Sequence, residues 1–212
     1  MTKVAVLGGT GTMGSVLARQ LSKRNEVRIG SRSLDRAIAA AAKIRGTKGG
    51  VDRDVAAWCD TAVLSVPFYA IGILIGFTRP LSGKLVISAV NPIVREGDLF
   101  QYALADRSAA ELVASALPLS RVATAFNNVP AAFLRKSTGQ RLDILVAADS
   151  KRTYEEAAVL VRSIPGLRPL YVGPLSQAQS VERLTVMVLN AAKLGGRSDI
   201  LVRFVSSGRK QA

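Results

Sequence analysis

A glycine-rich segment near the start of the chain has the composition of a phosphate-binding turn. It reads GGTGTMG at residues 8–14, directly after an apolar run at residues 4–7 and before a segment with helical periodicity. The order strand, glycine turn, helix is typical of the opening unit of a dinucleotide-binding fold. In such a unit Gly9 allows a tight turn, Gly11 lets a pyrophosphate approach the backbone, and Gly14 lets the helix pack closely on the strand.

Backbone amides of this segment are expected to bind the phosphates. The N–H groups of residues 10–13 point towards a ligand at the N-terminus of the helix, where the helix dipole favours negative charge. A glycine turn with a purely structural role is the alternative, but both flanks match the nucleotide-binding pattern. The predicted backbone part of the site therefore consists of Gly9, Thr10, Gly11, Thr12, Met13 and Gly14.

The end of the second predicted strand, at residues 26–31, decides between the two nicotinamide cofactors. Enzymes that use NAD usually have an acid there, which accepts hydrogen bonds from the ribose hydroxyls. This chain has Ser31 and Arg32 instead, with Arg36 one helical turn later. Guanidinium groups and a hydroxyl suit a 2′-phosphate, which an acid would repel. A solvated basic helix start is the alternative, but Arg32 occupies the cofactor-selecting position, so we predict NADP.

Several enzyme classes are excluded by residues that the sequence lacks. Histidine is absent, which excludes Ser-His and Cys-His hydrolases and nearly all histidine metal sites. The single cysteine, Cys59, excludes an internal disulfide and a cysteine-based zinc site. None of the four tyrosines is followed four residues later by lysine, so the Tyr-x-x-x-Lys pair of short-chain dehydrogenases is missing. We therefore expect no metal site and no catalytic side chain.

Composition and charge are typical of a globular enzyme with anionic ligands. The chain has 212 residues, enough to bury a full core, and a net charge of +14, which favours acidic partners. The basic residues form no arginine-rich run, so we expect a phosphorylated small molecule and no nucleic acid. The apolar runs at residues 72–77 and 185–192 are too short to span a bilayer, and no signal peptide precedes the first strand. We therefore expect no membrane insertion and a cytoplasmic location.

Apolar runs and helical patterns alternate along residues 1–126. This alternation predicts parallel strands joined by right-handed crossovers, with helices on both faces. We therefore expect an α/β fold with a doubly wound parallel sheet of the Rossmann type. After the second strand, strands are predicted at residues 60–67, 84–90 and 121–126, and helices at residues 12–24, 34–45, 68–77 and 108–117.

A smaller C-terminal α/β lobe is expected after the turn at residues 127–130. Its strands are predicted at residues 142–147 and 167–172, and its helices at residues 151–164 and 176–194. The apolar residues 200–205 either form a strand or pack into a site. We therefore divide the chain into an NADP-binding domain at residues 1–128 and a lobe at residues 129–212 that completes a cleft.

Motifs along nearly the whole chain carry a family resemblance. They are the glycine turn, residues 30–32 (GSR), 62–67 (AVLSVP), 107–111 (RSAAE), 125–131 (AFNNVPA), and 166–170 (GLRPL) with 173–175 (GPL). The last three are more family-specific than the glycine turn. Together they resemble the coenzyme F420-dependent NADP reductases. The resemblance implies hydride transfer between NADP(H) and the deazaflavin F420, whose ring lies beside the nicotinamide in the cleft between the two lobes.

The resemblance also implies roles for residues outside the glycine turn. Phe68, Asn91 and Ala131 match positions that line the nicotinamide side of the cleft. Both reacting carbons would belong to the cofactors, which suits a chain without histidine. We expect NADP(H) and a deazaflavin co-substrate as partners, and a homodimer.

The acceptor is expected between the lobes, against segments that follow three predicted strands. These segments are Val66-Pro67-Phe68, Asn91-Pro92 and residues 127–131, at the carboxyl edge of a parallel sheet, where such folds bind ligands. Prolines that only end strands are the alternative.

Two segments depart from the family pattern. Residues 147–150 read AADS where the family commonly has CGDD, and residues 199–204 read DILVRF where it has a GIKF-like segment. Because the C-terminal segment contributes to the acceptor pocket, three functions stay open. They are an NADP–F420 oxidoreductase, a related NADPH-dependent reductase of a flavin or ferric chelate, and a non-enzymatic NADP-binding regulator.

Overall fold

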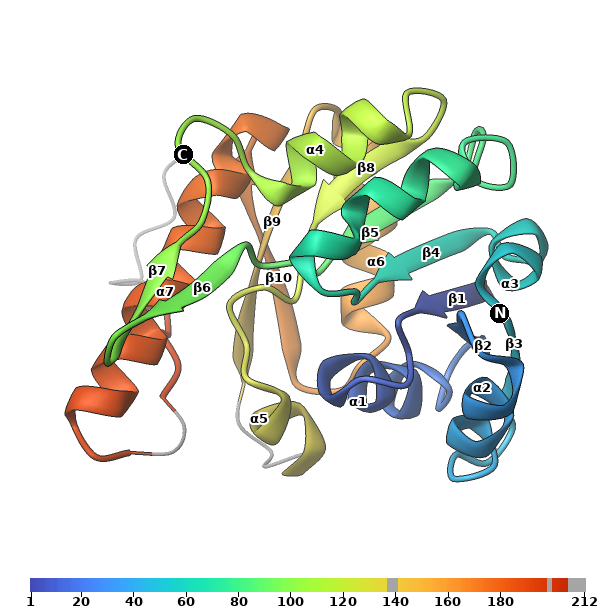
Figure 1. Ribbon diagram of the computed structural model, residues 1–212, viewed down its shortest axis with the longest axis horizontal. Coiled ribbons are helices and arrows are strands. Elements are labelled where there is room, and N and C mark those ends of the chain that lie inside the picture. Colours follow the sequence, from blue (N-terminus) through green and yellow to red (C-terminus); the bar gives the residue numbers. More distant parts are fainter. Residues whose placement is uncertain (137–140, 198–199, 206–212) are drawn as a thin grey trace, which may run out of the picture.

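Eight strands form one continuous sheet at the centre of the computed structural model, which describes residues 1–136, 141–197 and 200–205 (Figure 1). The strands are β1 (Lys3–Leu7), β2 (Glu26–Ser31), β3 (Lys48–Val51), β4 (Thr61–Leu64), β5 (Leu85–Ser88), β8 (Arg121–Thr124), β9 (Leu142–Ala148) and β10 (Leu167–Gly173). Their order across the sheet is β10-β9-β8-β5-β4-β1-β2-β3. Strands β1 to β5 and β8 are parallel, whereas β9 pairs antiparallel with β8 and parallel with β10. The predicted Rossmann-type α/β fold is confirmed.

Helices cover both faces of this sheet. They are α1 (Thr12–Leu21), α2 (Leu34–Ala41), α3 (Asp52–Trp58), α4 (Ala109–Ala116), α5 (Ala131–Lys136), α6 (Lys151–Arg162) and α7 (Ala178–Leu194), with 3-10 segments η1 (Phe68–Phe77) and η2 (Leu175–Gln177). One core cluster joins the sheet to α1 and α6 through residues such as Leu17 and Val161, and a second joins it to α3 and α4 through Val55 and Val113. Alternate residues of β1 point into the two clusters, Val4 into the first and Ala5 into the second. No helix in the described part of the chain is both long and apolar enough to cross a membrane.

Six elements differ from the sequence-based expectation. Strand β3, helix α3, the hairpin β6 (Ile93–Glu96) and β7 (Leu99–Tyr102), and helix α5 were not predicted, and η1 is a 3-10 segment where a helix was expected. Strand β3 reads KGGV and has no apolar run. Helix α2 approaches it so closely that a Cβ atom on Gly49 would lie 2.3 Å from the Ala37 carbonyl carbon. Close backbone approach therefore keeps β3 in place where apolar side chains are missing. Residues 200–205 form no strand; Leu201 packs against the first core cluster.

The junction between β8 and β9 lies where the chain was expected to divide. Only Ala123 and Thr124 of β8 are in register with β9. Asn128 extends this junction, because its side-chain amide donates to the Asp143 carbonyl at 2.8 Å and accepts from the Leu145 amide at 3.1 Å. The C-terminal strands thereby continue the N-terminal sheet. The division at residues 128 and 129 stays a prediction.

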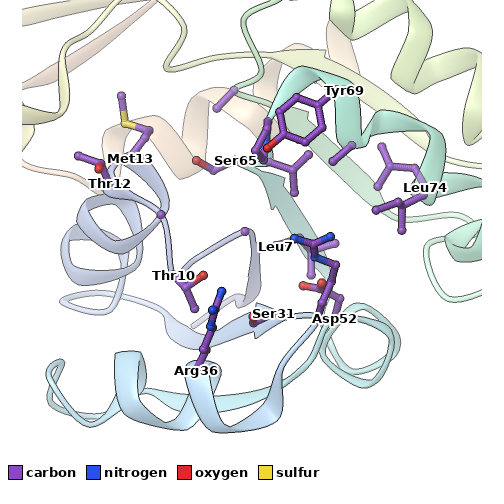
Figure 2. A pocket seen from close by; sticks show the side chains of 18 of the residues that line it. Leu7, Thr10, Thr12, Met13, Ser31, Arg36, Asp52, Ser65, Tyr69 and Leu74 are labelled. Carbon is purple, nitrogen blue, oxygen red and sulfur yellow. The ribbon is translucent and has the colours of Figure 1, made fainter.

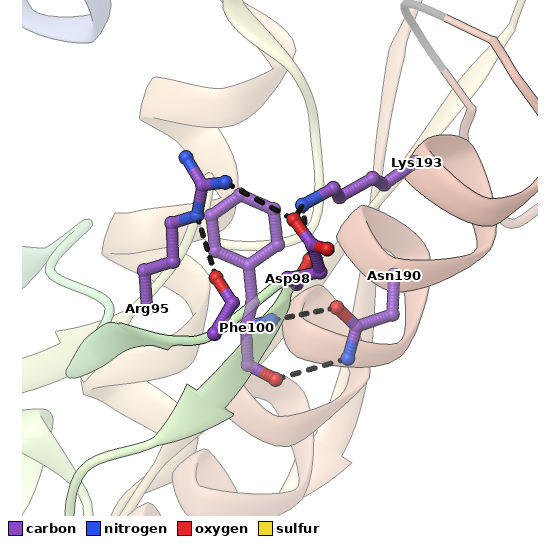
Figure 3. A network of polar contacts seen from close by, with 6 residues as sticks. Arg95, Asp98, Phe100, Asn190 and Lys193 are labelled. Carbon is purple, nitrogen blue, oxygen red and sulfur yellow. Dashed lines mark hydrogen bonds and ion pairs between the residues drawn. The ribbon is translucent and has the colours of Figure 1, made fainter.

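The β6–β7 hairpin is fastened to α7 by side chains (Figure 3). The Asn190 amide accepts from the Phe100 backbone N–H at 2.8 Å and donates to the Phe100 carbonyl at 2.9 Å. It therefore pairs with β7 as a neighbouring strand would. At the turn, Asp98 Oδ1 forms ion pairs with Lys193 Nζ at 3.0 Å and with Arg95 Nη2 at 3.4 Å. Both contacts of this exposed carboxylate lower its pKa, with Lys193 as the larger cause.

A fully buried carboxylate joins α7 to β7 and α4. Glu182 accepts hydrogen bonds from the Tyr102 hydroxyl at 2.7 Å and from the amides of Ala109 and Ala110 at 2.9 and 3.1 Å. Burial raises the pKa of Glu182, and these hydrogen bonds oppose the rise. The carboxylate satisfies two amides of the first turn of α4, which have no acceptor inside the helix.

Glu182→Gln is expected to lower the free energy of unfolding by about 1–2 kcal/mol, because glutamine has one acceptor oxygen and turns an N–H group towards the remaining donor. The midpoint of urea unfolding measures this loss. Glu155→Gln, on the exposed side of α6, is the matched control and should change stability by a few tenths of that amount. Equal midpoints for the native chain and Glu182→Gln would contradict the expectation.

Candidate functional site

A cavity of about 780 Å³ lies at the carboxyl edge of the sheet (Figure 2). It crosses the ends of β2, β1, β4 and β5, and so spans the position between β1 and β4 where the strand order reverses. Ligands of doubly wound folds bind at such a switch point. The volume falls in the range of small-molecule pockets.

The glycine turn forms the floor of the cavity. Gly8 has a φ of +79°, and a Cβ atom there would lie 2.5 Å from the Ser65 carbonyl oxygen, so the turn leaves β1 against the segment after β4. A Cβ atom on Gly14 would lie 2.4 Å from the Gly8 carbonyl oxygen. The first turn of α1 can therefore pack directly on the glycine turn, and its N-terminus is held beside the cavity.

The start of α1 offers backbone donors to an anion. Gly11 is the N-cap residue, and the first bond inside the helix runs from the Ser15 amide to the Gly11 carbonyl at 2.9 Å. The amides of residues 12–14 therefore have no acceptor within the helix. Gly11, Thr12 and Met13 line the cavity, and no acid lies in the first turn of α1. The helix dipole adds positive potential at this end.

Two guanidinium groups stand at the β2 end of the cavity. Ser31 ends β2, Arg32 follows it, and Arg36 lies in the first turn of α2, whose N-cap is Ser33. The Ser31 hydroxyl accepts from the Ser33 amide at 3.3 Å. Arg32 and Arg36 are exposed, and neither forms a close ion pair with any carboxylate in the described segments. Both charges thus remain available to a phosphate.

An acid that the sequence analysis missed lies at the same end of the cavity. Asp52, the first residue of α3, lines it together with Ser31 and Arg36, and Figure 2 shows the three side chains around the end of β2. Burial raises the pKa of Asp52, whereas the charge of Arg32 and a hydrogen bond with the Gly8 backbone oppose that rise. The sequence offered a signal, since Asp52 directly follows the strand next to β2, but β3 itself was not recognised.

One wall of the cavity is apolar and comes from the segment after β4. Val66 and Pro67 lead into η1, which contributes Tyr69, Ile73 and Leu74 among others. Tyr69 is 86% exposed and Ile73 is 48% exposed, whereas Leu74 is buried in the core. Segment η1 therefore packs against the core through some side chains and lines the cavity with others. The nearly uniform hydrophobicity of residues 68–77 was the available signal.

Hydrogen bonds hold the β5 end of the cavity. The Asn91 side chain donates to the Asn127 carbonyl at 3.1 Å and accepts from the Asn127 side chain at 3.2 Å. The Asn127 carbonyl also accepts from the Thr185 hydroxyl of α7 at 2.9 Å. Phe126, fully buried, has a φ of +68°, a left-handed conformation that turns Asn127 back towards β5. Two hydrogen bonds with Asn127 thus hold the Asn91 side chain at the cavity wall.

The structure brings most of the predicted site residues together around one cavity. Thr10, Gly11, Thr12, Met13, Ser31, Arg32, Arg36, Val66, Pro67 and Asn91 line it. Gly9 and Gly14 lie in the glycine turn without lining the cavity, and a Cβ atom on Gly9 would lie 2.8 Å from the Ile29 side chain of β2. Phe68 packs against the second core cluster, and Ala131, the first residue of α5, packs against the first. The lining residues that were not predicted are Leu7, Gly8, Ser33, Asp52, Ser65, Tyr69, Ala70, Ile73, Leu74, Phe77 and Ala89.

A family model and two relatives in sequence agree on one family. Residues 3–92 match the family model described as NADP oxidoreductase, coenzyme F420-dependent. The F420-dependent NADP reductase of Methanothermobacter marburgensis is 34% identical over 207 residues, covering 89% of this chain and 91% of that protein. The enzyme of the same name from Methanocaldococcus jannaschii is 32% identical over 202 residues, covering 88% of this chain and 91% of that protein.

A solved structure gives the same result for the fold. A crystal structure from Arthrobacter sp. FB24 superposes with a TM-score of 0.87 and covers 97% of this chain and 100% of that chain. Its sequence identity of 21% makes it a comparison of fold alone. The sequence relatives therefore identify the family, and the solved structure independently supports the fold.

Proposed function

The chain belongs to the family of F420-dependent NADP reductases, and on that premise we propose that its cavity binds NADP(H) and presents it to the deazaflavin coenzyme F420 for hydride transfer. The family resemblance inferred from the motifs is confirmed by these identities. The observation that carries the proposal is the meeting, in one cavity, of a helix N-terminus with Ser31, Arg32 and Arg36. Backbone amides suit a pyrophosphate and paired guanidinium groups suit a 2′-phosphate.

The residues of this chain bind and orient rather than react. When bound, the nicotinamide and the deazaflavin supply the two carbons between which the hydride moves. The α1 amides and the two arginines hold the phosphates, and these contacts fix the position of the rest of the nucleotide along the cavity. The apolar wall of Val66, Pro67 and η1 excludes water from one side. Asn91, held by Asn127, gives the far end of the cavity a rigid polar group.

The acceptor cleft is proposed at the β5 end, between residues 1–128 and 129–212. Support comes from the Asn91–Asn127 contact, which joins the cavity wall to the turn that leads into Ala131 and α5. The Thr185 hydroxyl of α7 donates to the Asn127 carbonyl and so connects α7 to the same turn. Phe68 and Ala131 then lie beside the nicotinamide end, as the family positions imply.

The activity is tested by following the visible absorbance of F420 as NADPH is added to the purified chain. Loss of the deazaflavin band, dependent on both NADPH and protein, is the expected result. Reduction of a flavin or ferric chelate without reduction of F420 would indicate the alternative reductase. Binding of NADPH without turnover on any of these acceptors would indicate the regulator.

The single-turnover rate is expected to depend only weakly on pH between about pH 6 and 8, because no unperturbed side chain of this histidine-free chain titrates there. Burial raises the pKa of the Cys59 thiol and so keeps it protonated across this window. Stopped-flow reduction of F420 by prebound NADPH measures the rate. A steep one-proton dependence, removed by substituting one Asp, one Glu or Cys59, would overturn hydride transfer without a protein acid or base.

We further propose a cytoplasmic homodimer whose partners are small molecules and not nucleic acid. The free, buried thiol of Cys59 suits a reducing compartment. Tyr171 of β10 and Met187 and Leu194 of α7 are at least half exposed, and exposed apolar side chains are common at subunit interfaces. Light scattering during size-exclusion chromatography tests the dimer.

A further inference from the structure

A buried threonine lies behind the polar end of the cavity. Thr124 is the last residue of β8, and its side chain is fully buried. Its hydroxyl lies 2.6 Å from Oδ1 of Asn127 and 3.2 Å from the Ser88 carbonyl. Because a hydroxyl has a single proton, the shorter contact is the stronger hydrogen bond. Oδ1 of Asn127 is therefore an acceptor here, and Nδ2 of the same amide is the donor on its other side.

The orientation of the Asn127 amide determines that of Asn91. Nδ2 of Asn127 donates to the Val90 carbonyl at 3.0 Å and to Oδ1 of Asn91 at 3.2 Å, and Nδ2 of Asn91 donates to the Asn127 carbonyl at 3.1 Å. A reversed Asn127 amide would set its oxygen against the Val90 carbonyl and against Oδ1 of Asn91, and two such oxygens form no hydrogen bond. The Thr124 hydroxyl and the Val90 carbonyl thus fix one orientation for both amides.

The backbone is strained where it brings Asn127 to this position. Phe126, the residue before it, has a φ of +68° and is fully buried. A bulky residue keeps this left-handed conformation only where the surrounding contacts require it. Here those contacts are the hydrogen bonds of Asn127, whose carbonyl accepts from Asn91 and from the Thr185 hydroxyl. The fold therefore keeps a costly backbone conformation directly before the residue that orients Asn91.

Asn91 is the member of this network that reaches the cavity. It lines the cavity and is partly exposed, whereas Thr124 and Asn127 are buried. Nδ2 of Asn91 carries two N–H groups, and only one of them has an acceptor among the described residues. In the proposed binding mode the phosphates lie at α1 and at the two arginines, and the nicotinamide lies at the β5 end. Its carboxamide oxygen is an acceptor that suits the remaining N–H group.

We propose that Thr124 and Asn127 are positioning residues, which orient the Asn91 amide so that its free N–H group donates to the carboxamide oxygen of a bound nicotinamide. The inference rests on the proposed function, because it concerns the far end of the same nucleotide site. Thr124 is fully buried and does not line the cavity, so it acts on the ligand only through the two amides.

Isothermal titration of NADP⁺ and of 2′,5′-ADP, which lacks the nicotinamide, tests the proposal. Thr124→Val keeps the shape of the side chain and removes the hydroxyl. The Kd for NADP⁺ should rise about threefold to tenfold, as expected for loss of one oriented hydrogen bond, whereas the Kd for 2′,5′-ADP should stay within about twofold. Thr124→Ser keeps the hydroxyl and should restore most of the native affinity. Thr61→Val, at a buried threonine of the opposite sheet edge, is the matched control and should change neither constant by more than about twofold.

A second background shows whether Thr124 acts through Asn91. Asn91→Leu should raise the Kd for NADP⁺ about tenfold and leave the Kd for 2′,5′-ADP within about twofold. Thr124→Val should then add no further loss, because the amide that the hydroxyl orients is gone. A further selective loss of NADP⁺ in this background would contradict the route through Asn91.

The outcomes separate this inference from the proposed function. If the native chain binds both ligands and Thr124→Val leaves the ratio of the two Kd values unchanged, the inference fails alone. Equal weakening of both ligands would also overturn it, in favour of a structural role. Thermal unfolding shows whether each variant is folded, and an unchanged ratio in Asn91→Leu overturns the inference even where Thr124→Val does not fold. If the native chain binds neither ligand, the proposed function fails and the inference fails with it.

Discussion

Arg32→Ala raises the KM for NADPH tenfold or more and leaves the KM for NADH nearly unchanged: this is the result we expect from steady-state assays of F420 reduction. The guanidinium follows the end of β2, lines the cavity and forms no close ion pair with the described residues, so its charge is available to the 2′-phosphate. Loss of one charge-assisted pair costs about 1.5–3 kcal/mol. NADH has no 2′-phosphate and loses little.

The control for this experiment is Arg45→Ala, which removes the same charge from an exposed residue that does not line the cavity. It separates a local contact from the general attraction of a chain with a net charge of +14. Equal use of NADPH and NADH by the native chain would refute the assignment of Ser31, Arg32 and Arg36 to a 2′-phosphate.

Ala131→Trp is expected to abolish turnover while NADPH still binds. Ala131 is the first residue of α5, four residues after Asn127, whose side chain and carbonyl both contact Asn91 at the cavity wall. A tryptophan side chain there would fill the proposed acceptor cleft. The phosphate contacts at the glycine turn and at Arg32 lie at the other end of the cavity and should be unaffected.

Two measurements on Ala131→Trp make this test decisive. Titration of NADPH should give a Kd within about threefold of the native value, which also shows that the variant is folded, since α5 packs against the core. Stopped-flow mixing with F420 should then show no reduction of the deazaflavin. Reduction at the native rate would mean that the acceptor binds elsewhere, and the cleft beside Ala131 would be wrong.

The strands nearest the cavity were predictable because each is a buried apolar run. Strands of a parallel sheet are covered on both faces, so β1, β4 and β5 are apolar apart from one polar residue at an end of each, Lys3, Thr61 and Ser88. The same rule fails for β3, which is kept in place by backbone contact between Gly49 and α2. It also fails for the β6–β7 hairpin, whose partner is the Asn190 side chain.

The candidate site was predictable where function depends on residues close together in the sequence. The glycine turn and the group Ser31, Arg32 and Arg36 each lie within one strand-to-helix connection. Asp52 joins them only through the pairing of β2 with β3, and β3, which reads KGGV, has no apolar run by which it could be recognised. Tyr69 and Ile73 are exposed apolar residues of a segment that reads as core, and only the folded chain shows that they face a cavity.

The single sheet limits how the enzyme opens and closes. The ladder between β8 and β9, with the Asn128 amide bound to the β9 backbone, joins the two ends of the chain into one plane. Rotation of one end against the other would leave the buried Asn128 amide and strand carbonyls without partners. The movement that this sheet leaves open to the site is therefore local motion at the rim, where η1 carries exposed Tyr69 and Ile73.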